Sequence, residues 1–265
     1  MLAAMIDLIE AIPKRPLVLM LSSFGVLCFA TWVGVALLAK LKVQVAELSE
    51  DLHIVENATL TLLALIIGFA FSMAVSRYDQ RKNLEEAEAN AIGTEWVRVE
   101  LLPAEDAARL KALLLAYTEA RIAFYRTSDD SEVAEIDRRT LKLQDELWAA
   151  IKGPALRAPT PVTALAVSGM NDVLNSQSYT QAAWLNRIPT GAWTLCLFIG
   201  IGATMLVGLG AKNTKSLSRV LLILPFVISV SFFLICDIDT PRHGLIAVHP
   251  TNLELLFQSM RTPAR

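Results

Sequence analysis

Four stretches of the chain are strongly apolar and contain no Asp, Glu, Lys or Arg. They cover residues 17–39, 57–76, 188–211 and 220–236. A helix of about 20 apolar residues crosses the hydrocarbon core of a bilayer, so each stretch predicts a transmembrane helix. The fourth stretch is at the lower limit of a spanning length and contains Pro225, which predicts a kink.

The polar residues gather mainly in the segment 77–187, where apolar positions recur at helical spacing. No proline separates residues 77–102 from the second apolar stretch. One helix is therefore expected to leave the membrane without a break and to end at Pro103. The other elements predicted here are a helix over 104–125, a turn at 127–132, a helix to about residue 152, a linker at 153–161 and a helix over 162–186.

The predicted fold is an all-α membrane protein with four transmembrane helices and a helical cytoplasmic domain inserted between the second and third spans. The expected segments are an N-terminal segment (1–16), a span (17–39), a short loop (40–56), a span (57–76), the helical domain (77–187), a span (188–211), a short loop (212–219), a span (220–236) and a cytoplasmic C-terminal tail (237–265).

The basic residues near the spans predict the orientation. An even number of spans places both termini and the segment 77–187 on one side of the membrane. That side carries seven basic residues and the other side five. The seven are Lys14, Arg15, Arg77, Arg81, Lys82, Arg187 and Arg242, and the five are Lys40, Lys42, Lys212, Lys215 and Arg219. The positive-inside rule then predicts cytoplasmic termini.

The composition supports the membrane interpretation and narrows the function. Hydrophobic residues make up 54% of the chain and charged residues 19%, and the mean hydropathy is +0.47. These values exclude a purely soluble protein and a disordered tail. The net charge of −2 gives no reason to expect a nucleic-acid partner. The three cysteines, Cys28, Cys196 and Cys236, lie within the apolar stretches and are interpreted as small hydrophobic residues.

No catalytic motif is evident. The chain contains no HExxH, no GxSxG and no glycine-rich phosphate loop, and no ionisable Asp, Glu, Lys or Arg lies within a span. The carboxylates of the central segment, in LEEAEAN (84–90) and DDSEVAEID (129–137), are expected to lie on solvated helix faces. The sequence therefore predicts a protein that is not an enzyme and that needs no cofactor.

The second apolar stretch carries a stripe of small and polar residues. At 100° per residue, all five members fall within about 80° of one another. They are Asn57, Thr61, Ala64, Gly68 and Ser72, and we call them the small-residue stripe. Small residues allow helices to pack closely in lipid, which is one interpretation. The other is that several copies of the chain turn the stripe towards an aqueous pore.

Beside this stripe, Leu63, Ile67 and Phe71 recur at intervals of four residues. Bulky apolar side chains at this spacing can form a hydrophobic constriction that gates a pore by dewetting. Contact with lipid is the alternative interpretation.

An acidic turn follows the fourth span. Asp237 and Asp239 come directly after it, and Pro241 and Gly244 predict a turn. Arginines are expected at the same side of the membrane, so an interfacial ion-pair network is predicted. Its basic members are Arg77, Arg187 and Arg242. A calcium site is the alternative, because carboxylate oxygens are the ligands that this ion prefers, although two carboxylates are too few alone.

Three segments of the sequence resemble the bacterial family of bestrophin-like domain proteins. They are residues 59–96 (TLTLLALIIGFAFSMAVSRYDQRKNLEEAEANAIGTEW), 185–189 (LNRIP) and 237–246 (DIDTPRHGLI), and the resemblance extends over about residues 54–250. It implies kinship with bestrophins, which are pentameric anion channels with four spans per subunit and a helical cytosolic portion. It therefore implies a homo-oligomer in a bacterial inner membrane that conducts small anions such as chloride.

The sequence departs from the bestrophin pattern at two places. A bestrophin neck has bulky apolar residues on the second span at every fourth position. Ile67 and Phe71 fit that spacing, but the next position is Val75 rather than an aromatic residue. A bestrophin calcium clasp has a dense acidic run, and here only two aspartates stand after the last span. A non-conducting membrane scaffold or sensor, whose helical cytoplasmic domain binds a protein partner, is the alternative to a channel. The small-residue stripe favours the channel.

Overall fold

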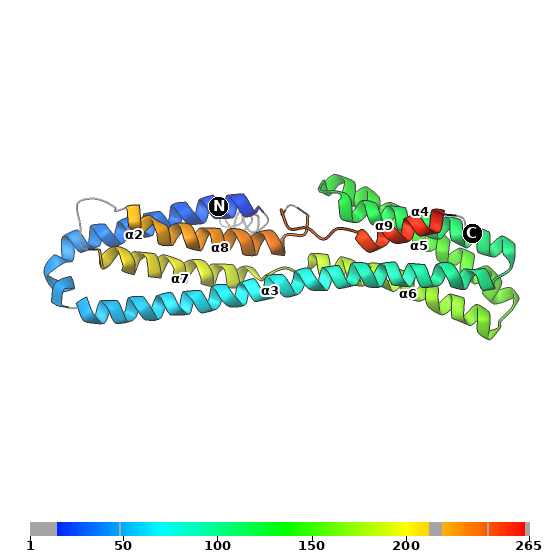
Figure 1. The fold of residues 1–265 in the computed structure, drawn as a ribbon, viewed down its shortest axis with the longest axis horizontal. Coiled ribbons are helices and arrows are strands. Elements are labelled where there is room, and N and C mark those ends of the chain that lie inside the picture. The colour runs from blue at the N-terminus through cyan, green and yellow to red at the C-terminus, as the bar shows by residue number, and fades with distance from the viewer. Residues whose placement is uncertain (1–14, 48, 212–218, 243, 263–265) are drawn as a thin grey trace, which may run out of the picture. The chain divides into compact units, whose positions relative to one another are not determined.

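The structure is a computed structural model that describes residues 15–47, 49–211, 219–242 and 244–262. Its elements in chain order are α2 (Pro16–Glu47), α3 (Ser49–Arg98), η2 (Val99–Leu101), α4 (Ala104–Arg126), α5 (Asp130–Arg157), α6 (Pro161–Leu185), α7 (Thr190–Leu209), η3 (Arg219–Leu222), α8 (Ile223–Asp239) and α9 (Thr251–Arg261) (Figure 1). No strand occurs in the described ranges. Lys14, Lys212, Lys215 and most of the predicted segments 1–16 and 212–219 lie outside the described residues.

The chain divides into two compact units, and each is described by itself. The membrane unit contains the described residues of 1–76 and 187–247, and the helical unit those of 77–186 and 248–265. Four helical segments are long and apolar enough to cross a membrane, which confirms the four predicted apolar helices. The chain is therefore an all-helical membrane protein.

In the membrane unit, α2 packs against both α7 and α8. Its core contains Leu27 of α2, Leu63 of α3, Cys196 of α7 and Phe232 of α8. Each of these side chains is at most 3% exposed. The apolar part of α3 is the least buried of the four candidate spans, so most of its surface is left uncovered by the rest of the chain.

The contact between α2 and α7 brings two backbones together. A Cβ atom on Gly34 would overlap the carbonyl oxygen of Met205, and one on Gly208 would overlap the carbonyl oxygen of Thr31. The two glycine Cα atoms also lie near each other, since each is about 3 Å from the other's ideal Cβ position. Close approach of this kind requires glycine on both helices, as is common where helices pack in lipid.

The predicted loop over residues 40–56 is wrong, because its described residues are helical. α2 continues to Glu47 and α3 already begins at Ser49. The segment contains no glycine or proline and consists largely of helix-forming residues. Its polarity therefore indicates the end of the apolar region rather than the end of the helices.

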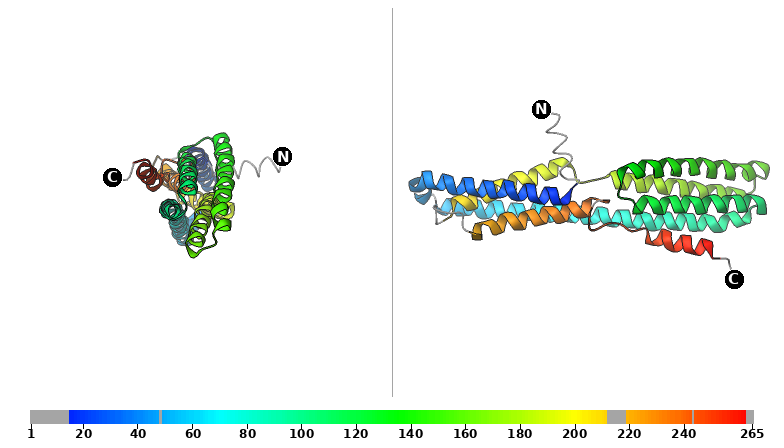
Figure 2. Two further views of the ribbon diagram at one scale, coloured as in Figure 1. Left: turned by 90° about the vertical axis from the view of Figure 1, so that its right-hand side faces the viewer. Right: turned by 90° about the horizontal axis from the view of Figure 1, so that it is seen from above.

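The helical unit contains the second part of α3 together with α4, α5 and α6, which run side by side (Figure 2). The uninterrupted helix predicted across residues 76 and 77 is present as α3, and Pro103 separates it from α4. Asp129 caps α5 by accepting a hydrogen bond from the Ser131 N–H, and Thr160 caps α6. These caps explain where two of the four helices begin.

Two predicted boundaries in this unit are wrong. The linker expected at 153–161 is shortened, because α5 runs through Pro154 to Arg157 and α6 begins at Pro161. The expected C-terminal tail also contains a helix, α9, which belongs to the helical unit. α9 packs against α4 and buries Leu253 and Met260, so an amphipathic pattern within the tail was overlooked.

Candidate functional site

All five residues of the small-residue stripe are exposed in the single chain. Their opposite side faces the core of the membrane unit, where Leu63, Ala70 and Ala74 of α3 are buried. A Cβ atom on Gly68 would meet nothing within 4 Å. The chain therefore does not use this stripe to pack its own helices, and the stripe remains available to a partner or to water.

The exposed surface of α3 has two halves. At 100° per residue the small-residue stripe occupies one half, and bulky side chains occupy the other. The bulky residues are Leu62, Leu65, Phe69 and Met73, each at least 39% exposed. Such a division is typical of a helix whose two exposed sides contact different surroundings.

The residues of the predicted constriction are not equivalent. Leu63 is 3% exposed and packs in the membrane unit's own core, so it does not line an accessible surface and its assignment to the constriction is wrong. The helical rotation explains the difference, because Leu63 lies about 80° from Phe71 towards the buried side. Ile67 is half-buried and Phe71 is 41% exposed, which leaves these two at the edge of the stripe.

The acidic turn after α8 is held by backbone hydrogen bonds. The N–H groups of Leu245 and Ile246 donate to the two carboxylate oxygens of Asp237, at 2.7 and 2.9 Å. The Ile188 N–H donates to Asp239 at 3.0 Å. A Cβ atom on Gly244 would overlap the Asp237 carbonyl oxygen, so only glycine fits there. Asp237 therefore ties the chain after α8 back onto the end of that helix.

The other predicted members of this network are divided between the units. Arg187 and Arg242 belong to the membrane unit, and Arg77 belongs to the helical unit. Their ion pairs with the aspartates stay a prediction. No cluster of three or more possible metal ligands occurs among the described residues, and both Asp237 oxygens already accept hydrogen bonds. The observed contacts thus favour a structural turn.

Replacement of Asp237 by Asn is expected to destabilise the membrane unit by about 1–3 kcal/mol. The amide has one acceptor oxygen instead of two, so one of the N–H groups of Leu245 and Ile246 loses its partner. Thermal melting of the purified protein in detergent checks this, with Asp79→Asn at an exposed position of α3 as the control. A chelator should leave the unmodified protein unchanged. A chelator that lowers its melting temperature as much as Asp237→Asn does would contradict the hydrogen-bonded turn and indicate a divalent cation.

Buried charged residues line one side of α3 in the helical unit. Five residues of α3 and the first residue of η2, at alternating intervals of four and three, are each at most 1% exposed, and four of these six are charged. They are Arg81, Glu85, Glu88, Ile92, Glu95 and Val99, and we call them the α3 seam. The expectation that the carboxylates of LEEAEAN are solvated is therefore wrong for Glu85 and Glu88. The spacing is that of a coiled-coil core, and it was the sequence signal that could have identified them.

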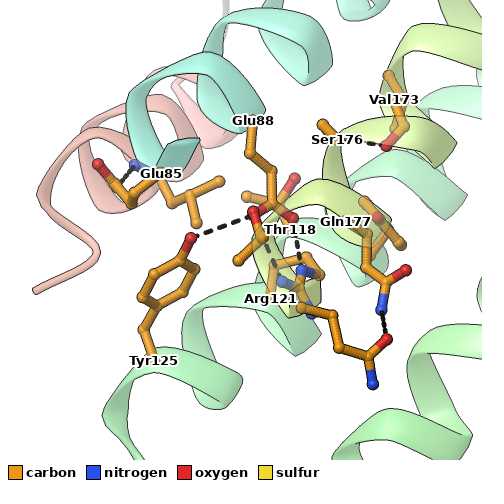
Figure 3. Close-up of polar contacts among 12 residues, drawn as sticks. Glu85, Glu88, Thr118, Arg121, Tyr125, Val173, Ser176 and Gln177 are labelled. Carbon is orange, nitrogen blue, oxygen red and sulfur yellow. Dashed lines mark hydrogen bonds and ion pairs between the residues drawn. The ribbon is translucent and has the colours of Figure 1, made fainter. Parts of the chain in front are cut away.

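Glu88 lies at the centre of a buried polar cluster (Figure 3). Its carboxylate accepts a hydrogen bond from the Arg121 Nε at 2.5 Å, and from the hydroxyls of Tyr125 and Thr180 at 3.3 and 3.2 Å. The Arg121 guanidinium also lies over the Phe124 ring, 4.5 Å from its centroid. Three helices, α3, α4 and α6, are thus joined through one carboxylate.

The electrostatics of this cluster keep its donors protonated. Burial alone would lower the pKa of Arg121, but the Glu88 carboxylate more than offsets this, so the net change raises the pKa. Burial first, and the charge of Glu88 second, raise the pKa of Tyr125. Arg121 therefore stays cationic and Tyr125 stays a hydrogen-bond donor throughout the physiological pH range.

The other charged residues near the start of the seam hold helix ends. Glu85 accepts hydrogen bonds from the Asn252 side chain at 2.7 Å and from the Leu253 N–H at 2.9 Å, so it caps the N-terminus of α9. A carboxylate is favourable there because of the helix dipole. Arg81 donates to the carbonyl oxygens of Ala183 and Asn186 at the C-terminus of α6, at 3.2 and 3.1 Å.

Comparisons with known proteins agree with this architecture. The family model described as "Bestrophin-like domain" matches residues 21–253. A solved structure of a bacterial bestrophin homologue from Klebsiella pneumoniae is 14% identical, with a TM-score of 0.59, and the match covers 88% of this chain and 96% of that chain. A variant of the homologue is 12% identical, with a TM-score of 0.62, over 91% of this chain and 97% of that chain. No curated protein matches the chain. At these identities the structures show a shared fold, and the family model, which spans most of the chain, shows that this protein belongs to the bestrophin-like domain family.

Proposed function

We propose that this protein is the subunit of an oligomeric ion channel and that α3 lines the pore. The observation that carries the proposal is the exposure of the small-residue stripe on the least buried span. Asn57 and Ser72 carry polar groups that hydrocarbon solvates poorly. One four-helix unit is too thin to enclose a water path, so several copies would have to meet with this side of α3 turned inwards.

The remaining features of the proposal come from the family. Bestrophin kinship favours a pentamer that conducts small anions such as chloride. Ile67 and Phe71, at the edge of the stripe, would form its narrowest part. In this arrangement the bulky half of α3 meets a neighbouring subunit or the bilayer. Both termini and the helical unit would face the cytoplasm of a bacterial inner membrane.

Chloride flux through liposomes that contain the purified protein tests the proposal. In a background without native cysteines, Thr61→Cys, Gly68→Cys and Ser72→Cys should each make the flux sensitive to a charged, water-soluble thiol reagent. The reagent adds bulk and charge to a narrow aqueous path. Ala70→Cys is the matched control, because Ala70 is 5% exposed on the opposite side of α3 and should not react. A monomeric mass in mild detergent and in native membranes, or the absence of flux, would count against the channel.

A scaffold that binds a protein partner is the second candidate. Leu141 and Trp148 lie two helical turns apart on α5 and are 56% and 40% exposed. Their spacing of seven residues places both on one face of the helix, which is where a protein partner would bind in this candidate. Two results together would favour this candidate. A protein copurifies with the chain and is no longer recovered with the Trp148→Lys variant, and liposomes that contain the purified chain show no chloride flux.

A further inference from the structure

Glu95 differs from the other acidic residues of the α3 seam. Its side chain is 0% exposed, as is that of Glu88. Glu85 and Glu88 both accept hydrogen bonds, whereas neither carboxylate oxygen of Glu95 has a hydrogen-bond partner among the described residues. A buried carboxylate without donors is costly in its charged form, so an explanation is needed for its position in the interior.

The neighbouring helix leaves space for this carboxyl group. A Cβ atom on Gly169 of α6 would overlap one oxygen of Glu95, and it would also approach the Arg98 side chain. Gly169 itself is buried. Glu95 therefore occupies a position between α3 and α6 that any larger residue at 169 would close.

The surroundings favour the neutral acid. Burial raises the pKa of Glu95 to about 8, an effect that Arg98 of α3 opposes and that Asp172 of α6 reinforces. These two are the charged groups that act on it from its own helix and from the helix packed against it. At neutral pH the side chain is thus mainly a carboxylic acid, which can remain in this buried position at a much lower cost than its anion.

We propose that Glu95 is a proton-binding site of the helical unit and that loss of its proton loosens α6 from α3. The sign follows from linkage. The packed state holds the proton to a higher pH than the opened state, in which a glutamate has a pKa of about 4.3. The contribution of this proton to the stability of the packed state is complete below a pH of about 4.3. It decreases as the pH rises and is lost above a pH of about 8. Alkaline conditions would therefore open this contact selectively.

Hydrogen exchange of α6 in the full-length protein in detergent tests the proposal at pH 6.5 and pH 9. After correction for the intrinsic exchange rate, the equilibrium constant for opening α6 should rise about 30-fold between these values. Glu95→Gln, which has nearly the same shape and no titratable proton, should abolish the rise. The matched control is Glu86→Gln, at an exposed position of the same helix, and it should keep the rise.

Two further variants distinguish titration of Glu95 from a general effect of alkaline pH. Asp172→Asn removes a negative charge and should reduce the rise, whereas Arg98→Gln removes a positive charge and should enlarge it. These opposite shifts decide the question even if Glu95→Gln does not fold. The proposal is overturned if the rise is absent in the unmodified protein, persists in a folded Glu95→Gln variant, or is the same in the Asp172 and Arg98 variants. None of these readouts requires ion conduction.

Discussion

Replacement of Arg121 by Met is expected to destabilise the helical unit by about 3–5 kcal/mol. The change leaves Glu88 in a fully buried position without the cation that accompanies it. Removal of one partner from a buried ion pair has this cost because the remaining charge is uncompensated. The hydroxyls of Tyr125 and Thr180 would be its remaining donors, and neither carries a charge. Chemical denaturation of the purified protein, followed by the circular dichroism of its helices, measures the decrease in the free energy of unfolding.

The matched control is Arg139→Met. Arg139 pairs with Glu119 in the same unit, but the two side chains are 50% and 59% exposed. Exposed pairs contribute about 0–1 kcal/mol, so this variant should be nearly neutral. The double variant Glu88→Gln with Arg121→Met should recover much of the lost stability, since it removes both charges. Equal effects of Arg121→Met and Arg139→Met would contradict the structural role of the buried pair.

Replacement of Gly208 by Val is expected to prevent α2 and α7 from packing. The first added carbon would overlap the carbonyl oxygen of Thr31, and a backbone atom cannot rotate away as a side chain can. The two helices must then separate along a contact that accounts for much of the membrane unit's interior. We expect a loss of at least about 3 kcal/mol, beyond the usual cost of overpacking.

Gly202→Val provides the control for this prediction. Gly202 lies on the same helix, α7, and a Cβ atom there would meet nothing within 4 Å. Melting temperature and the yield of monodisperse protein in detergent should fall sharply for Gly208→Val and little for Gly202→Val. Similar behaviour of the two variants would show that the close contact between α2 and α7 is not required.

The sequence predicted the four apolar helices because membrane solvation imposes a strong requirement on composition. The continuity of α3 was predictable for a related reason, since no proline interrupts residues 49–98. Boundaries in polar segments were less predictable. Residues 40–47 and α9 are polar enough to suggest loops, yet they form helices. The polarity of a segment indicates that it is exposed to water, and it does not indicate whether the segment is helical. Helix formation depends on intrinsic propensity and on tertiary contacts, and tertiary contacts are not evident from a single sequence.

The small-residue stripe was predictable from helical periodicity, but the burial of its neighbours was not. Leu63 and Phe71 have the same apolar character in sequence, and only the packing of α2, α7 and α8 distinguishes them. The α3 seam was missed for a different reason. Glutamate is normally exposed, so a buried glutamate becomes evident only when a partner such as Arg121, 33 residues away, is brought beside it.

The cap that Glu85 provides for α9 also orders events during synthesis of the chain. Glu85 and its donor Leu253 are 168 residues apart, so the ribosome completes α3, α4, α5 and α6 long before this cap can form. Until then Glu85 lacks the donors Asn252 and Leu253, and the apolar surface against which Leu253 and Met260 will pack is uncovered. Chaperones and proteases recognise such surfaces on incomplete chains. A chain terminated before α9 would therefore lack both the donors for Glu85 and the cover of this apolar surface, even though all four apolar helices are present.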